Sequence, residues 1–316
     1  MKVALCFIIS YEHILNKEEI WKEWIEPNKD IINVYFYYKD FKKIKSEWIM
    51  KHTIPPDYIY ETSYYHVIPA YLSLMSFAIK HDINNQWFCM LTDSCCPIIS
   101  PKKFRYLFYN YYNKTFLSWK RAWWNIDFHK RANLALLPEE FRLANDPWFV
   151  MKRENAIQCL NFAIFQKKPT ETICNGGLAN ESLFAIIMCA CRQLNGTASS
   201  VISAVTHTTD WSRRTNATSP HLFKEGNETD IKFINNSLET NKYVMFIRKV
   251  APTFPDKLLR EYIYEKSKDD DDKLIVITPI YFIALKIKKY LYFFTYYSVY
   301  YGIPLLFLSY IFKYNF

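Results

Sequence analysis

Three continuous apolar segments separated by helical patterns constrain the fold more than any other feature of the 316-residue sequence. KVALCFII (2–9), IINVYFYY (31–38) and WFCMLT (87–92) are typical of strands that are buried on both faces, as parallel strands are. NKEEIWKEWI (16–25) and HVIPAYLSLMSFAIKH (66–81) lie between them and have the apolar spacing of helices. Strands that alternate with helices predict an α/β fold with a mostly parallel central sheet.

The rest of the chain up to residue 256 continues this pattern less regularly. Residues 120–146 are expected to be irregular, and residues 195–242 to be polar and loop-rich. Asn180 is expected to cap a helix that has Glu181 in its first turn. The further predicted elements are a helix over 101–112, a strand over 115–119, a strand that turns into a helix over 148–165, a helix within 175–194 and a last strand over 243–250.

The composition changes after Asp256. The sequence predicts a domain over residues 1–260, a charged linker over 261–273 and a hydrophobic helical tail over 274–316. Residues 290–312 carry no charge, and these 23 residues are long enough to cross a bilayer. We therefore expect a membrane-associated tail, with a buried or partner-covered helix pair as the alternative.

Charge and cysteine content exclude several classes of protein. The net charge is +9, but the sequence has no zinc finger, RNA-binding aromatic motif or long basic tract, so nucleic-acid binding is not expected. None of the eight cysteines forms a CxxC pair or has zinc-ligand spacing. No metal site and no cofactor are predicted.

One polar cluster ends the third predicted strand. Thr92-Asp93-Ser94-Cys95-Cys96-Pro97 follows the apolar run and, on sequence alone, fits a metal site, a disulfide, a reactive thiol or the rim of a binding site. Ligands of parallel sheets bind beyond the carboxyl ends of the strands. We therefore expect Ser10, Asp40, Asp93 and Ser94 along one edge of the sheet.

Several segments, in order, resemble the core-2/I-branching N-acetylglucosaminyltransferase family (glycosyltransferase family 14), especially its plant-type branch. The resemblance covers about residues 1–256 and includes a helix, a turn and a strand that ends in Leu91-Thr92-Asp93-Ser94-Cys95. The segments that carry it are ETSYYHVIPAYLSLMSFAIKHDINNQWFCMLTDSCCPIIS (61–100), FLSW (116–119), DPWFVMKRENA (146–156), LANESLFA (178–185), THTTDWSRRTNATSPHLF (206–223) and FIRKV (246–250).

The resemblance implies a GT-A-like nucleotide-sugar fold and an inverting sugar transfer from a UDP-sugar without a divalent metal. Consistent with this, the strand ends in Thr-Asp-Ser rather than Asp-x-Asp. The family's catalytic base falls on Glu181, with Asn180 in place of the usual aspartate. The donor sugar implied is similar to N-acetylglucosamine, and the acceptor is a hydroxyl of a glycan or glycoprotein.

Fixed cations are then expected to hold the leaving diphosphate. The family's lysine falls on Lys249, while strand alternation places Arg248 on the opposite face. The second cation is left open among Arg213, Arg214 and Lys224. Residues expected to contact the uracil or other parts of the nucleotide, the sugar or the acceptor are Asp40, Ser10, Asp93, Ser94, Trp148 and Trp211. His207 is expected to be structural.

Two questions stay open at this level. Asn180 and the uncertain second cation also fit a catalytically degenerate sugar-binding or membrane-tethered interaction protein. The first strand begins at residue 2, so no N-terminal anchor is expected. If the tail is the membrane anchor, the domain faces the cytosol; the Golgi or ER lumen, usual for the family, is the alternative.

Overall fold

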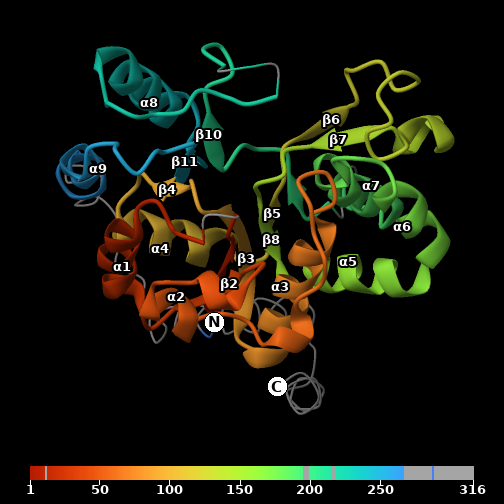
Figure 1. Ribbon diagram of the computed structural model, residues 1–316, viewed down its shortest axis with the longest axis horizontal. Coiled ribbons are helices and arrows are strands. Elements are labelled where there is room, and N and C mark those ends of the chain that lie inside the picture. Colours follow the sequence, from red (N-terminus) through yellow and green to blue (C-terminus); the bar gives the residue numbers. More distant parts are fainter. Residues whose placement is uncertain (11–12, 195–198, 215, 217, 267–286, 288–316) are drawn as a thin grey trace, which may run out of the picture. The chain divides into compact units, whose positions relative to one another are not determined.

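The computed structural model describes residues 1–10, 13–194, 199–214, 216, 218–266 and 287 (Figure 1). The chain divides into two compact units, Met1–Leu274 and Ile275–Phe316. The description below concerns the first unit, because the predicted tail and most of the predicted linker lie outside the described residues. No helix of the described residues is long and apolar enough to span a membrane.

A six-stranded sheet forms the centre of this unit. Its strands are, in spatial order, β2 (Ile32–Tyr37), β1 (Lys2–Ile8), β3 (Asn85–Thr92), β8 (Val150–Lys152), β5 (Thr115–Phe116) and β9 (Val201–Ile202). β1 pairs in parallel with β2 and β3, and β5 pairs in parallel with β9, whereas β8 runs antiparallel to β3 and β5. The predicted mixed α/β fold with a mostly parallel central sheet is confirmed.

Helices cover both faces of the sheet (Figure 1). Successive side chains of a strand point to opposite faces. On one face Phe7 of β1 packs edge-on against Trp21, with 4.9 Å between ring centres. On the other face Ala4 and Cys6 belong to the core that α3, α5 and α7 cover. The helices are α1 (Glu18–Ile25) and α4 (Pro101–Tyr111) on the first face, and α3 (Ile68–His81), α5 (Arg153–Phe165) and α7 (Leu183–Ala190) on the second.

A second sheet stands at the carboxyl end of β3. Its order is β10 (His207–Thr209), β11 (Phe246–Arg248) and β4 (Cys96–Pro97). Because β4 follows β3 after a three-residue turn and pairs with β11, the end of β3 and the end of β11 are brought together. This junction positions the candidate site.

Two stretches expected to be without regular structure are partly ordered into elements. The loop-rich prediction for 195–242 is wrong over α8 (Glu228–Thr240), whose first turn is capped by the Asn227 side chain accepting from the Asp230 N–H at 3.0 Å. The irregular stretch 120–146 begins and ends in a two-stranded antiparallel sheet, β6 (Trp119–Arg121) and β7 (Leu143–Asn145).

Lys17, near the start of this unit, binds residues 252–256 near its end. Its buried ammonium group donates to the carbonyls of Pro252 at 2.6 Å and Phe254 at 2.5 Å, and pairs with the Asp256 carboxylate at 2.6 Å. The chain then continues through α9 (Asp256–Arg260) into a π-helical turn over Glu261–Glu265. The remaining helices are α2 (Glu47–Lys51) and α6 (Lys167–Cys174), and short 3₁₀ turns cover Glu26–Asn28, Phe41–Lys43, Pro56–Tyr58, Leu134–Leu136, Glu139–Phe141 and Ala179–Glu181.

Candidate active site at the carboxyl ends of β3 and β11

The carboxyl ends of β1 and β3 meet as predicted. The Ser10 N–H donates to the Asp93 carboxylate at 3.0 Å, and the Asn16 N–H donates to the Asp93 carbonyl at 3.0 Å. Asp40, after β2, caps a short 3₁₀ turn by accepting from the Lys42 N–H at 3.1 Å. These parallel strands therefore bring Ser10, Asp40 and Asp93 to one edge, although each carboxylate already has a backbone partner.

Arg248 reaches into this edge from the second sheet. Its Nη1 donates to the Thr92 hydroxyl at 2.8 Å and the Ser94 hydroxyl at 3.3 Å, and its guanidinium carbon lies 3.7 Å from the centre of the Trp148 ring. Arg248 therefore lies at the edge that carries Thr92 and Ser94, although strand alternation predicted it on the face opposite Lys249. β11 ends at Arg248, so the alternation of a regular strand does not extend to Lys249.

The Arg248 guanidinium has no anionic partner among the described residues. Its hydrogen bonds to Thr92 and Ser94 go to neutral hydroxyls, and its buried Nε has no acceptor within the described part of the chain. Burial lowers the pKa of Arg248, opposed by nearby acidic groups such as Asp93. Because a desolvated cation is costly unless it is paired, this arrangement suits an anionic ligand.

Lys249 adds a second cation beside Arg248. Its ammonium group lies 3.5 Å from the Ser219 hydroxyl, a long contact, and is partly buried. Burial, and then the charge of Arg248, lowers the pKa of Lys249, whereas Asp93 raises it. The two cations and Asp93 therefore share one electrostatic environment.

Glu181 is held by a tight turn rather than by a helix start. Leu178 adopts a left-handed backbone conformation with φ of 57°, and the 3₁₀ turn Ala179–Glu181 follows. The expectation that Asn180 caps a helix is wrong, because α7 begins after Ser182 and has no side-chain cap. Instead, the Asn145 side chain fixes this turn by donating to the Asn180 carbonyl at 2.9 Å.

Arg131 pairs with Glu181, with 3.0 Å between Nη1 and Oε2, and about a quarter of each side chain is exposed (29% and 27%). Burial raises the pKa of Glu181; the charge of Arg131 opposes this, and Arg248 also lowers it. The charge of Arg248 lowers the pKa of both Glu181 and Lys249, so the predicted base and the predicted diphosphate-binding lysine both sense this arginine.

No motif in the sequence pointed to Arg131, which lies in the stretch expected to be irregular. A close backbone contact holds it in place. The Ala132 N–H donates to the Gly177 carbonyl at 3.0 Å, and a Cβ on Gly176 would lie 2.3 Å from the Asn133 backbone nitrogen. Glycine at position 176 therefore lets the segment that carries Arg131 approach the segment that carries Glu181.

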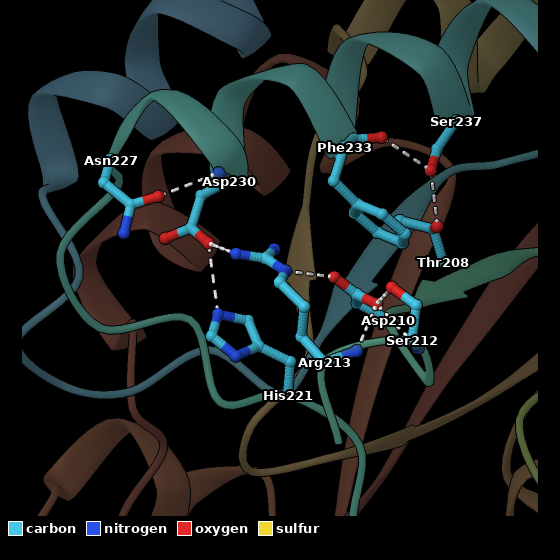
Figure 2. Close-up of polar contacts among 9 residues, drawn as sticks. All are labelled: Thr208, Asp210, Ser212, Arg213, His221, Asn227, Asp230, Phe233 and Ser237. Carbon is cyan, nitrogen blue, oxygen red and sulfur yellow. Dashed lines mark hydrogen bonds and ion pairs between the residues drawn. The ribbon is translucent and has the colours of Figure 1, made fainter. Parts of the chain in front are cut away.

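The three open candidates for the second cation differ in their partners. Arg213 is bound by two carboxylates, from Nε to Asp210 at 2.6 Å and from Nη1 to Asp230 at 2.9 Å (Figure 2). Arg214 and Lys224 are exposed. Sequence reasoning therefore missed Arg248, although it stands next to Lys249 in the FIRKV segment.

The aromatic candidates differ in their surroundings. Trp148 is covered on one face by Arg248 and is partly exposed, whereas Trp211 is 49% exposed. His207 is buried and packs 4.8 Å from the Phe246 ring, and burial lowers its pKa, in keeping with a structural role. A cavity of about 450 Å³ beside α1 and β2 is bordered by none of the candidate site residues.

The two adjacent cysteines point into the core. Cys95 and Cys96 are fully buried, and all eight cysteines are free thiols. Burial raises the pKa of both thiols, which makes them poor nucleophiles. Among the described residues, no group of three or more His, Cys, Asp or Glu side chains is arranged to hold a metal ion.

Two comparisons with known proteins bear on this site. A sequence model of the family described as Core-2/I-Branching enzyme matches residues 33–236, which include β3, Trp148, Arg131 and Glu181 but end before β11. A search of curated proteins finds no match.

Proposed function

This chain belongs to the Core-2/I-branching enzyme family, which is a family of glycosyltransferases, and from that premise we propose that it transfers a sugar from a UDP-sugar to a hydroxyl of a glycan or glycoprotein. We further propose a GT-A-like fold, inversion at the transferred carbon, no divalent metal and a donor sugar similar to N-acetylglucosamine. The observation that carries the proposal is the Arg248 guanidinium, which donates to the Thr92 and Ser94 hydroxyls at the end of β3 and lacks an anionic partner among the described residues.

Arg248 and Lys249 would stabilise the departing diphosphate. The bond from the sugar carbon to the phosphate oxygen breaks, and negative charge grows on UDP as it leaves. Fixed cations directed at that charge stabilise the transition state without reorganising, and a guanidinium can hold two phosphate oxygens at once. Lys249 and Arg248, rather than Arg213, are the pair that the contacts favour.

Glu181 would remove the proton of the acceptor hydroxyl while the acceptor oxygen bonds to the sugar carbon. A carboxylate whose pKa is raised is a stronger base than an exposed glutamate. Arg131 would keep the carboxylate in one orientation. Direct attack from the side opposite the leaving UDP gives inversion.

The sugar and acceptor contacts follow from the same edge. Asp93 uses one carboxylate oxygen for the Ser10 N–H, which leaves the second for a sugar hydroxyl. Ser94 and the partly exposed Trp148 lie beside Arg248. Trp211, with half of its side chain exposed, is a stacking surface for the acceptor.

The catalytically degenerate alternative is less well supported. A binding protein needs no base, yet Glu181 combines a raised pKa with a fixed ion pair. Membrane association through the tail, and the cytosolic or lumenal location of the domain, stay predictions that concern residues outside those the structure describes.

A donor screen with and without EDTA tests the proposal. We expect one or a few UDP-sugars to be hydrolysed or transferred and to raise the melting temperature of the protein. We expect 5 mM EDTA, about a thousandfold above trace metal, to leave the rate within about twofold, because basic side chains of the protein supply the positive charge. Adding Mg²⁺ or Mn²⁺ back to the EDTA-treated protein is the control. A rate that disappears with EDTA and returns with metal contradicts metal independence, and no stabilisation by UDP contradicts the donor class.

Replacing Arg131 should shift the pH dependence of the reaction. Arg131 lowers the pKa of Glu181 through its charge and hydrogen bond, so in R131M that pKa rises further. Because the base must be ionised, activity is lost as pH falls through its pKa, and the acidic limb of kcat/KM should move up by about one pH unit. The matched control is R121M, an exposed arginine near Glu139. If the acidic limb of the pH profile does not move in R131M, Arg131 does not control the pKa of the catalytic base.

A further inference from the structure

The segment from Asp210 to Phe223 holds Lys249 in place. The Phe223 N–H donates to the Lys249 carbonyl at 2.8 Å, and the Ala251 N–H donates to the Phe223 carbonyl at 2.9 Å. The Ser219 hydroxyl, within the same segment, lies 3.5 Å from the Lys249 ammonium group. Any displacement of this segment therefore displaces both the backbone and the charged end of Lys249.

A buried ionic cluster fixes that segment against α8 (Figure 2). We call Asp210, Arg213, His221 and Asp230 the Arg213 cluster. Asp210 and Asp230 are almost fully buried, at 1% and 2% exposure, and Arg213 joins them. The Nε2 of the His221 ring lies 3.1 Å from the Asp230 carboxylate. The backbone N–H of His221 donates to the Asp210 carbonyl at 2.8 Å.

Two more contacts connect the cluster to Lys249. The fully buried Phe223 ring lies 4.9 Å from the His221 ring and 5.8 Å from the Arg213 guanidinium. Phe223 is also the residue whose backbone pairs with Lys249 and Ala251. Arg213 donates through Nε to Asp210 and through Nη1 to Asp230, and its buried Nη2 has no acceptor among the described residues. With two carboxylates already paired to its charge, Arg213 is less suited than Lys249 to bind an anionic ligand.

We propose that Arg213 is a positioning residue: through the Arg213 cluster and Phe223 it sets the location of the Lys249 ammonium group, which binds the donor diphosphate. This inference rests on the proposed function, in which Lys249 contacts that diphosphate. The cluster offers no net positive charge to the nucleotide, since two carboxylates surround one guanidinium.

A double-mutant cycle on the full chain tests the proposal, with UDP and uridine as probes in calorimetry. R213K keeps the positive charge but cannot bridge both carboxylates in the same way, so UDP affinity should fall about fivefold while uridine affinity is unchanged. K249A alone should lower UDP affinity about tenfold or more. In the K249A background R213K should have no further effect, because both changes act through one ammonium group. R260K, at an arginine that binds Glu23 through two nitrogens, is the matched control.

The outcomes separate the two proposals. Equal loss of UDP and uridine affinity in R213K, or additive effects of R213K and K249A, overturns the positioning role and leaves the proposed function standing. UDP affinity that K249A does not change overturns the proposed role of Lys249 and the inference with it. If R213K does not fold, as judged by circular dichroism, D230N replaces it in the same cycle, because asparagine keeps the shape of the side chain and an acceptor oxygen. Effects of D230N and K249A that are additive, or no effect of D230N on UDP affinity, also overturn the inference.

Discussion

Sugar transfer by E181Q should fall by about a hundredfold to ten-thousandfold, the range over which a general base contributes to a reaction. Glutamine keeps the shape of the side chain and an oxygen that Arg131 can hold, but it cannot accept the acceptor proton. UDP affinity should stay within about threefold, since in the proposed mechanism Glu181 acts on the acceptor hydroxyl and not on the diphosphate. The measurement is the single-turnover rate with the donor that the screen identifies, together with UDP binding by calorimetry.

E154Q is the matched control for E181Q. Glu154 lies in the first turn of α5, its side chain is 64% exposed, and its nearest cation is Lys152 at 3.6 Å. Its replacement should leave transfer unchanged. Full activity in E181Q would remove the base from the proposed mechanism, and loss of UDP binding in E181Q would point to a structural role instead.

R248M should lose UDP affinity by about tenfold to a hundredfold, since a hydrogen bond to a charged group is worth about 1.5–3 kcal/mol. The same variant should keep its melting temperature within a few degrees without ligand, because it removes a desolvated charge that lacks an anionic partner among the described residues. Methionine also retains contact with the Trp148 ring. Calorimetric titration with UDP and a thermal melt of the free protein check both expectations.

R153M is the comparison for R248M. Arg153 donates to the backbone carbonyls of Asn85 at 3.1 Å and Ile79 at 3.2 Å, so it connects α5 to the amino end of β3, opposite the carboxyl end that carries the candidate site. We expect R153M to lower the melting temperature and leave UDP affinity unchanged. If R248M instead behaves like R153M, with a lower melting temperature and unchanged UDP affinity, Arg248 serves the fold and not the ligand.

The strands and main helices could be predicted from the sequence because their signals are local. β1, β2 and β3 are apolar runs, and the residues after them meet at one edge simply because parallel strands share a direction. α8 was missed, although Asn227 followed by Glu228 and Asp230 is a common helix start. The many polar residues in and around α8 made its short apolar face, which includes the buried Ile234, difficult to recognise in the sequence.

The site residues that were missed depend on contacts between distant segments. Arg248 reaches Thr92 and Ser94 because β11 pairs with β4. These strands have only three and two residues, which is too short for a periodic pattern in the sequence to predict their pairing. Arg131 reaches Glu181 across 50 positions through the close approach at Gly176. From the sequence alone Arg213 is a reasonable candidate to bind the diphosphate, because its ion pairs with Asp210 and Asp230 form only in the folded protein.

The Lys17 contacts determine how far a shortened version of the protein must extend. A fragment that stopped at residue 236, where the family match ends, would lack β11 and leave the buried Lys17 ammonium without the carbonyls and carboxylate that surround it. Tyr262 and Ile263 are buried as well. A shortened version that keeps these contacts therefore runs from the first strand through the π-helical turn, some thirty residues beyond the region of family similarity.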